Sequence, residues 1–208
     1  MLQSSRTKPE GWTKLMEAYG LPKNEETYQK LITAYSEKHR AYHTLEHIDS
    51  CFRHLDSVHS KTDRPHEVEL ALWFHDVIYA PFSKTNEEDS AELARSFLLH
   101  NKIDPEVIDR VYDLIILTKD HMAPDSRDGE IMLDVDLSIL GSAKHVYEQF
   151  EKDVRKEYKR VPSFIFKKKR REILKSFRGR PRLYHTDYFF GRLETQAKIN
   201  LEWAITTL

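Results

Sequence analysis

Apolar residues recur every three or four positions along most of this chain. Between residues 43 and 58, for example, they stand at Leu45, Ile48, Cys51, Phe52 and Leu55. Because an α-helix has 3.6 residues per turn, this spacing places them on one face of a helix. With only six glycines in 208 residues, the pattern favours α over β structure and predicts an all-α protein, a bundle of packed helices.

The same spacing of apolar residues predicts a series of helices joined by short polar segments. Pro65 and the pair Asp104-Pro105 suit helix starts, and Asn24 is the expected N-cap of an early helix. The helix after Pro65 is apolar nearly all round, so it should be the most buried. The expected helices span residues 10–19, 24–38, 43–58, 65–77, 87–100, 105–117, 131–140, 142–158, 163–177 and 187–206, with loops at 81–86 and 121–130.

The length of 208 residues suits one domain with a sizeable core, and no repeat or linker divides it. Cys51 is the only cysteine, which excludes an intrachain disulfide and a cysteine-based zinc knuckle. The opening residues MLQSSRTKPEGW lack the apolar stretch of a signal peptide, and no apolar run approaches membrane length. We therefore expect a cytoplasmic protein with no membrane partner.

The net charge of −1 conceals a strong asymmetry along the chain. Residues 151–182 hold 14 lysines and arginines against 4 acidic residues, so the remainder is acidic. Such a segment could face an anionic ligand or a nucleic acid. The alternative is a solvated helical face with ion pairs to the acidic remainder. No glycine-rich or aromatic-interleaved nucleic-acid motif accompanies it, so nucleic-acid binding ranks last among the functions considered.

The first motif with chemical potential is Tyr42-His43-Thr-Leu-Glu46-His47. On the predicted helix, His43 and His47 are four residues apart and would stack on one face. The pair alone is weak evidence, because eleven histidines produce chance pairs that are mostly exposed.

A second motif, His75-Asp76, lies inside the otherwise apolar run from Leu72 to Ile78. Burying a carboxylate and an imidazole there is costly without partners. A metal ion removes the cost, because it supplies positive charge and accepts both nitrogen and oxygen ligands. The alternatives are a hydrogen-bonded core pair or a helix end.

In the third motif, Asp134 and Asp136 interrupt an apolar helix. One of them could satisfy a helix N-terminus while the other faces a metal, and capping alone is the alternative. Together the three motifs bring His, His-Asp and Asp from three helices that can converge inside a bundle. Two imidazoles and two carboxylates suit one divalent ion, namely Mn, Fe, Ni, Zn or Mg.

The order His47, then His75-Asp76, then Asp136 resembles the HD superfamily of metal-dependent phosphohydrolases. That resemblance implies these four residues as metal ligands, with Asp136 preferred over Asp134 because Leu-Ser follows it. The Tyr42-to-His47 motif is also similar to a helix of cyclic-nucleotide phosphodiesterases, in which the first histidine donates a proton. His43 would take that catalytic role here.

Further stretches resemble a group of predicted HD phosphohydrolases and together cover most of the chain. The implied fold is a single HD-type domain over 1–208, with a metal-site core at about 40–141 and basic helices at about 142–208. The stretches are Arg40-Ala-Tyr42-His43, His75-Asp76-Val-Ile-Tyr79, Asn86-Glu87, Leu133-Asp-Val-Asp136-Leu-Ser-Ile-Leu-Gly141, Arg155-Lys-Glu157-Tyr158 and Glu194-x-x-x-x-x-Asn200-Leu201.

One departure from the superfamily pattern bears on the number of metals. Its binuclear branch has further metal-binding histidines between His-Asp and the last aspartate. Only His100 and His121 fall in that interval here, and they do not form a pair. We therefore expect a mononuclear site.

The implied reaction is hydrolysis of a phosphate ester, of a nucleotide or a similar small molecule, by metal-activated water. Asp76 or Asp136 would orient that water, His43 would protonate the leaving oxygen, and Glu87 or Glu88 is a candidate general base. Four further residues are candidates for substrate binding: Arg40, Lys84, His121 and Arg155.

Two other functions fit the same residues. The first is a non-catalytic, metal-containing regulatory module that binds a nucleotide without turning it over. The second is nucleic-acid binding through residues 151–182, which predicts a steep salt dependence and no need for metal. A small phosphorylated substrate remains the expected partner, and a homo-oligomer is left open.

Overall fold

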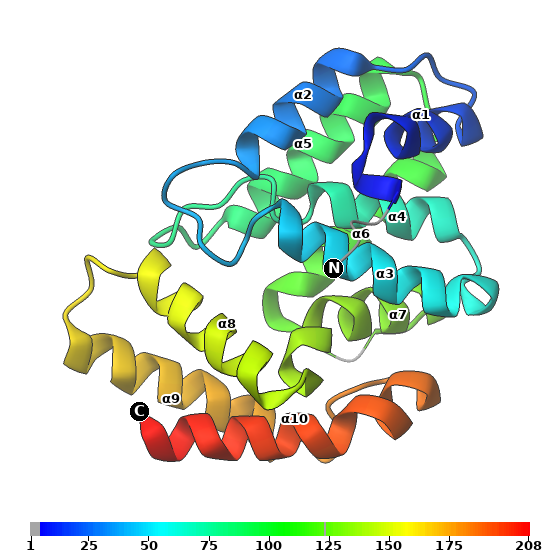
Figure 1. Ribbon diagram of the computed structural model, residues 1–208. Helices are drawn as coiled ribbons and strands as arrows, with labels where there is room; N and C mark the ends of the chain where they lie inside the picture. Colours follow the sequence, from blue (N-terminus) through cyan, green and yellow to red (C-terminus); the bar gives the residue numbers. More distant parts are fainter. Residues whose placement is uncertain (1–4, 123) are drawn as a thin grey trace.

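The computed structural model describes residues 5–122 and 124–208, and within these ranges it is all-helical, with no strand. Figure 1 shows the arrangement. Three short 3₁₀ helices are η1 (Ser5–Thr7), η2 (His59–Lys61) and η3 (Leu137–Gly141). The α-helices are α1 (Pro9–Ala18), α2 (Glu25–Ala34), α3 (Leu45–Val58), α4 (Pro65–Phe74), α5 (Asn86–His100), α6 (Pro105–Asp120), α7 (Arg127–Asp136), α8 (Lys144–Glu157), α9 (Ser163–Gly179) and α10 (Asp187–Thr207).

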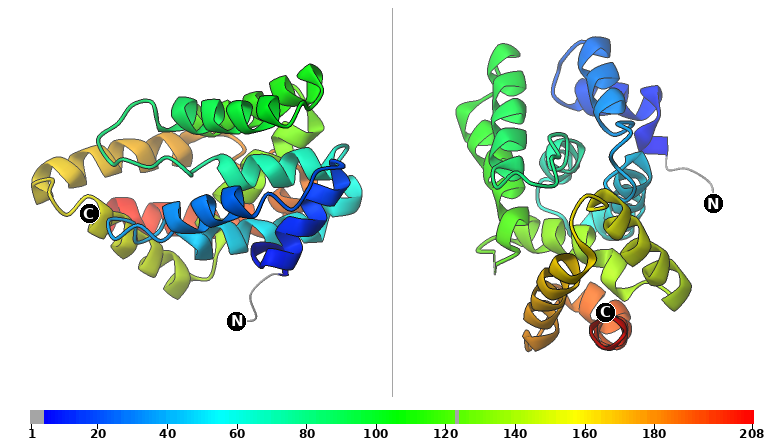
Figure 2. Two further views of the ribbon diagram at one scale, coloured as in Figure 1. Left: turned by 90° about the horizontal axis from the view of Figure 1, so that it is seen from above. Right: turned by 90° about the vertical axis from the view of Figure 1, so that its left-hand side faces the viewer.

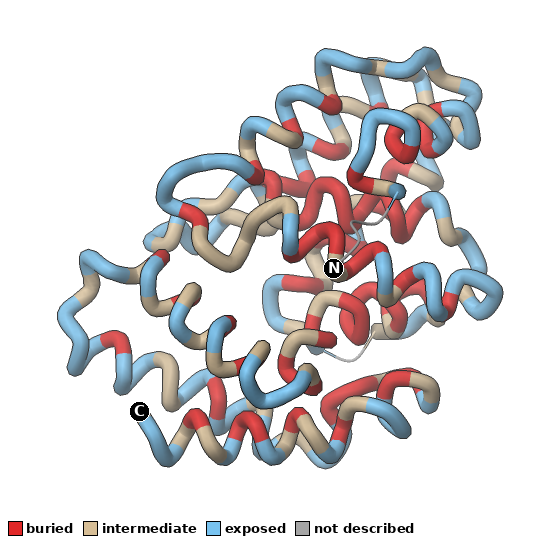
Figure 3. The backbone as a smooth tube through the Cα atoms, in the orientation of Figure 1, coloured by how far each residue is buried: buried red, intermediate tan, exposed pale blue. Residues whose placement is uncertain are grey.

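Helix α4 is the centre of the fold. It packs against α1, α3, α5, α6 and α7, and Figure 2 shows it end-on between the α5–α6 pair and the N-terminal helices. Every residue from Glu67 to Phe74 is buried, which confirms the prediction drawn from its apolar sequence. Figure 3 shows the buried backbone concentrated in this central region. No helix in the described ranges combines the length and the apolar character needed to cross a bilayer.

Several helix ends differ from the prediction, and local hydrogen bonds explain why. Helix α3 begins at Leu45 instead of residue 43, because Thr44 is its N-cap and accepts a hydrogen bond from Glu46 N at 3.3 Å. Helix α7 begins at Arg127, inside the expected loop, because Ser126 caps it through Gly129 N at 3.1 Å. Apolar periodicity does not detect these ends, because the capping residues are polar.

Two helices end earlier than the sequence predicts. Helix α4 ends at Phe74, so His75 is its C-cap and Asp76 lies beyond it. Helix α2 ends at Ala34, well before residue 38. Asn24 does occupy the N-cap position of α2, but its side chain makes no capping hydrogen bond; its amide donates to Pro22 O at 3.0 Å instead.

Helices α8, α9 and α10 form the lower part of the molecule in Figure 1, with α9 packed along α10. Buried polar side chains join α10 to the rest of the fold. Asn200 donates to Leu140 O at 2.9 Å and to Ser142 O at 2.8 Å, which fixes the end of η3 and the residue that follows it. Glu194 accepts hydrogen bonds from the backbone N–H groups of Leu183 and Tyr184.

Candidate metal centre and its pocket

Three helix ends bring the predicted ligands together. His47 lies in the first turn of α3, His75 caps the C-terminus of α4, and Asp136 is the last residue of α7. Their ligand atoms all lie within 4.8 Å of one another, and both histidines are buried. This group could hold a metal ion.

The distances within the group are those expected of atoms that share one ion. His47 Nε2 lies 3.3 Å from His75 Nε2 and 3.2 Å from Asp136 Oδ1, and His75 Nε2 lies 3.5 Å from that oxygen. Ligands about 2.1 Å from a common ion lie roughly 3.0 Å apart at a right angle and roughly 3.4 Å apart at the tetrahedral angle. The donor set and its spacing therefore fit a divalent cation.

Asp76 lies at the edge of this group. Its Oδ2 is 3.0 Å from His75 Nε2 and 3.5 Å from His47 Nε2, but it is outside the three-residue cluster defined by mutual proximity. Asp76 also lines the adjoining pocket. Its position suits a carboxylate shared between an ion and a bound molecule.

Hydrogen bonds orient two of the groups. His75 Nδ1 donates to Leu72 O at 2.9 Å, so Nε2 is the ring nitrogen directed at the cluster. His121 Nε2 donates to Asp136 Oδ2 at 2.9 Å, so the other carboxylate oxygen of Asp136 faces the histidines. His121 itself has a left-handed backbone, with φ of 48°, and its carbonyl accepts from Arg180 at 2.5 Å.

The electrostatics of the group favour a cation. Burial would lower the pKa of His75, but the carboxylates of Asp76 and Asp136 outweigh it and raise that pKa well above its ordinary value. Burial would also raise the pKa of Asp136, but hydrogen bonds from the surrounding imidazoles hold it well below its usual range. The pKa of Asp76 is also lowered, because the charge of His75 outweighs burial. Both carboxylates therefore stay ionised, and together they attract positive charge.

The two aspartates of the third motif have different surroundings. Asp134 is fully buried and accepts from His185 N at 2.6 Å and Thr186 N at 2.8 Å, immediately before α10. Asp136 faces the two histidines instead. One carboxylate thus satisfies backbone N–H groups while the other takes part in the candidate metal centre.

His43 does not stack on the helix that carries His47, because it precedes the Thr44 N-cap. The prediction of two histidines one helical turn apart is therefore wrong. Both rings nevertheless face the same region, with centroids 6.1 Å apart. The ring of His43 also stacks on Tyr79 at 4.2 Å.

Glu157, at the end of α8, holds the His43 segment in place. Its Oε1 accepts from the backbone N–H groups of Ala41, Tyr42 and His43 at 2.8, 2.8 and 3.0 Å. Its Oε2 accepts from His43 Nδ1 and from the Tyr79 hydroxyl, both at 2.8 Å. One buried carboxylate therefore fixes three consecutive backbone groups and the orientation of the imidazole.

The pKa values of this pair are shifted in opposite directions. Burial would raise the pKa of Glu157, but hydrogen bonds from His43 and from backbone N–H groups hold it at about 2, against an ordinary value of 4.5. Burial would lower the pKa of His43, but Asp76 and then Glu157 outweigh it and raise that pKa. The geometry favours a protonated imidazole hydrogen-bonded to a carboxylate.

Glu157→Gln should weaken the dependence of stability on acid pH. Because the folded-state pKa of Glu157 lies below its unfolded value, its ionised form stabilises the fold above about pH 4.5, and this contribution is lost as pH falls toward 2. Wild type should lose on the order of 2 kcal/mol more than the variant between pH 6 and pH 3. Urea unfolding at both pH values measures this. Parallel losses in the two proteins would contradict the prediction.

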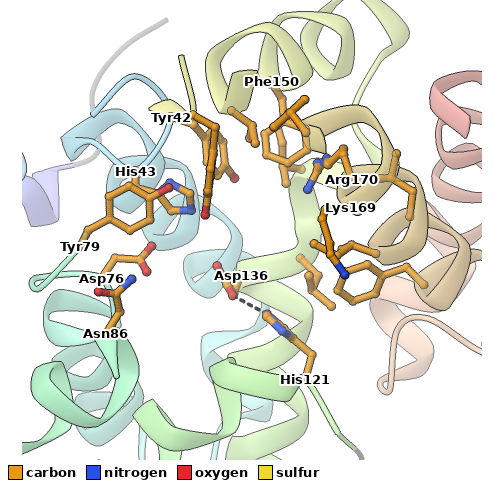
Figure 4. Close-up of a pocket in the computed structure, with 18 of the residues that line it drawn as sticks. Tyr42, His43, Asp76, Tyr79, Asn86, His121, Asp136, Phe150, Lys169 and Arg170 are labelled. Atoms are coloured by element: carbon orange, nitrogen blue, oxygen red, sulfur yellow. Dashed lines mark hydrogen bonds and ion pairs between the residues drawn. The ribbon is translucent and has the colours of Figure 1, made fainter. Parts of the chain in front are cut away.

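A pocket of about 470 Å³ adjoins the metal centre. Figure 4 shows His43, Tyr79 and Asp76 on one side, Lys169 and Arg170 on the other, and Asp136 with His121 between them. Of the predicted substrate-binding or catalytic residues, His43, Asp76, Glu87 and His121 line this pocket.

The other predicted substrate-binding residues lie elsewhere. The Arg40 guanidinium donates to the carbonyls of His43, Asp76 and Val77. Arg155 donates to Tyr158 O and Val161 O, so both arginines are committed to backbone groups. Lys84 is exposed outside the pocket lining.

The two glutamates proposed as alternative bases also separate. Glu88 forms an ion pair with Lys119 and does not line the pocket, whereas Glu87 does. Glu87 is partly buried at the start of α5. Only Glu87 is placed where it could meet a bound molecule.

Sequence reasoning gave no role to Glu157 or Tyr79. Both appeared only within stretches that resemble the HD group, and Glu157 lies 114 residues from His43. Helical periodicity identifies Glu157 only as a residue near the end of an amphipathic helix. The resemblance of Arg155-Lys-Glu157-Tyr158 was the one signal that could have drawn attention to it.

No family model, curated protein or solved structure matches this chain. The HD resemblance therefore rests on the sequence motifs alone. Over residues 5–122 and 124–208, the structure is all-helical and contains a His47, His75 and Asp136 group that could hold a metal ion.

Proposed function

We propose that this chain is a metal-dependent phosphohydrolase of the HD type that hydrolyses the phosphate ester of a small molecule. One observation carries the proposal: ligand atoms of His47, His75 and Asp136 converge beside a pocket that also contains His43. A metal group used only for structure has no need of an adjoining cavity, nor of a histidine that lines it.

In this proposal, His47, His75 and Asp136 are ligands of one divalent ion, and Asp76 is the fourth. Mixed imidazole and carboxylate donors suit Mn, Fe, Ni, Zn or Mg. When bound, such an ion neutralises phosphate charge and lowers the pKa of water, so that hydroxide is available near neutral pH. Asp76, at the border between the cluster and the pocket, is placed to orient the attacking water.

His43 is the proposed proton donor. Its Nδ1 is bonded to Glu157, so Nε2 is the nitrogen left for the pocket that His43 lines. Asp76 and Glu157 raise the pKa of the ring, which favours its protonated form, and the Nε2 proton would pass to the oxygen of the departing alcohol. Glu157 is a positioning residue, because it acts on the substrate only through His43.

His121 and Glu87 have supporting roles in this proposal. His121 holds Asp136 through Oδ2, which fixes the oxygen directed at the ion. Glu87 lines the pocket from the start of α5 and is the remaining candidate for a base that accepts a proton from water.

Metal analysis of the purified protein, followed by phosphate release with added Mn, Ni or Mg, tests the function. We expect about one divalent ion per chain and release of inorganic phosphate that a chelator abolishes and added metal restores. Metal-loaded protein that releases no phosphate from any ester would overturn catalysis. That result would favour the non-catalytic nucleotide-binding module.

A further inference from the structure

The pocket beside the metal centre has two unlike halves. The half nearest the centre carries the imidazoles and carboxylates described above. The opposite wall comes from η3, α8, α9 and the turn between α8 and α9, and most of its side chains are apolar. They are Leu137, Ile139, Leu140, Phe150, Val154, Tyr158, Val161, Ile165, Phe166, Ile173, Leu174 and Phe177.

Helix α9 presents apolar side chains to the pocket on two stretches, with Lys169 and Arg170 on the turn between them. Ile165 and Phe166 are followed by Ile173 and Leu174 two turns later, and then by Phe177. Ile165 and Ile173 are 42% and 48% exposed. These two side chains are therefore not packed into the core and are available to contact a bound molecule.

The cations on this wall offer little to a second anionic group. Arg170 makes two hydrogen bonds to Glu151, at 3.0 and 2.7 Å, and its guanidinium lies over the Phe150 ring. Its charge is therefore compensated within the wall. Lys169 is exposed and lies 3.0 Å from the exposed carboxylate of Glu172, so a polyphosphate would gain a single flexible lysine.

Polar groups at the pocket rim are largely used by the protein itself. The Asn86 carboxamide accepts from Ala80 N at 3.0 Å and donates to Ala80 O at 3.1 Å. Ser83 is hydrogen-bonded to the Thr85 hydroxyl and backbone. Recognition of sugar hydroxyls or base edges requires such groups to be available for the ligand.

On the basis of the proposed function, we propose that this site takes phosphomonoesters whose organic group is bulky and apolar. The phosphate lies at the metal end, and an aromatic ring or alkyl chain packs against Ile165, Ile173 and the neighbouring aromatic rings. Sugar phosphates and nucleoside polyphosphates are disfavoured, because they would bury polar groups against this wall without partners.

Esters with matched leaving groups test the preference with the full, metal-loaded chain. Octyl phosphate is compared with glycerol 3-phosphate and AMP, which are all esters of primary alcohols, and 1-naphthyl phosphate is compared with phenyl phosphate. We expect kcat/KM to be at least about tenfold higher for octyl and for naphthyl phosphate within their sets, mainly through KM. The two sets separate alkyl from aromatic recognition.

Two variants of α9 locate the effect. Ile165→Ser with Ile173→Ser should lower the octyl-to-glycerol ratio of kcat/KM about tenfold. Phe164→Ser is the matched control, because Phe164 is 75% exposed on the same helix and does not line the pocket. It should leave the ratio unchanged. Equal ratios in all three proteins, or a preference for glycerol 3-phosphate or AMP, would overturn the proposal.

A binding measurement separates this proposal from the proposed function. Octylphosphonate cannot be hydrolysed, and calorimetry should show that it binds at least about tenfold more tightly than methylphosphonate, with a negative heat-capacity change. If octylphosphonate binds more tightly but no ester releases phosphate, the proposed catalytic function is wrong and the proposed apolar site is supported. If esters are hydrolysed but the two phosphonates bind equally tightly, the proposed apolar site is wrong and the proposed catalytic function is supported.

Discussion

Asp136→Asn should remove the bound metal and, with it, phosphate release. Asparagine has nearly the shape of aspartate, but it removes the charge that faces His47 and His75. Loss of an outer partner of a metal ligand already costs about 10- to 100-fold in affinity, so loss of a ligand charge should cost at least about 100-fold. Metal content after dialysis and the rate of phosphate release measure the two effects.

Asp134→Asn is the matched control, two residues away on the same helix. Asp134 accepts hydrogen bonds from the backbone ahead of α10 and is outside the metal group. This variant should lose about 1–2 kcal/mol of unfolding free energy and keep its metal. If Asp134→Asn lost metal while Asp136→Asn kept it, the ligand assignment would be reversed.

His43→Ala should lower kcat by about 10²- to 10⁴-fold, the usual contribution of a positioned proton donor. Metal content should stay at the wild-type level, because His43 is outside the cluster of ligand atoms. A structural histidine would instead change the unfolding free energy and leave the kcat of folded protein intact. Steady-state kinetics with metal analysis on the same sample distinguishes the two.

The partners of His43 provide graded companions for that experiment. Glu157→Gln keeps an oxygen for the backbone N–H groups but removes the charge beside His43, so kcat should fall while KM changes little. Tyr79→Phe removes the second donor to Glu157 Oε2 and leaves the His43–Glu157 bond. Tyr79→Phe should therefore lower kcat less than Glu157→Gln does. Equal effects of the two would argue against a positioning role for Glu157.

The sequence was informative where burial and chemistry conflict. A carboxylate and an imidazole within an apolar run need partners, so His75 stood out without any structure. The same reasoning separated two tasks for Asp134 and Asp136, because an acid in an apolar helix must either cap backbone groups or meet a cation. The choice of Asp136 over Asp134 as the metal ligand came from the family resemblance and not from the helical periodicity of the sequence.

The sequence was less informative about direction and long-range pairing. Arg40 adjoins the His43 motif, which made it a candidate for phosphate binding, yet its guanidinium turns to the carbonyls of Asp76 and Val77. Glu157 reaches the same region from far along the chain. Adjacency in sequence does not fix where a long side chain points, and periodicity does not show which helices meet.

The contacts of Asp134 and Glu157 also bear on whether the metal centre could exist as a smaller protein. A fragment ending at Gly141 would retain all four proposed ligands. It would leave the buried Asp134 carboxylate without the N–H groups of residues 185 and 186, and the N–H groups of residues 41–43 without Glu157. We therefore do not expect the ligand-bearing segment to fold on its own, because the C-terminal helices complete these hydrogen bonds.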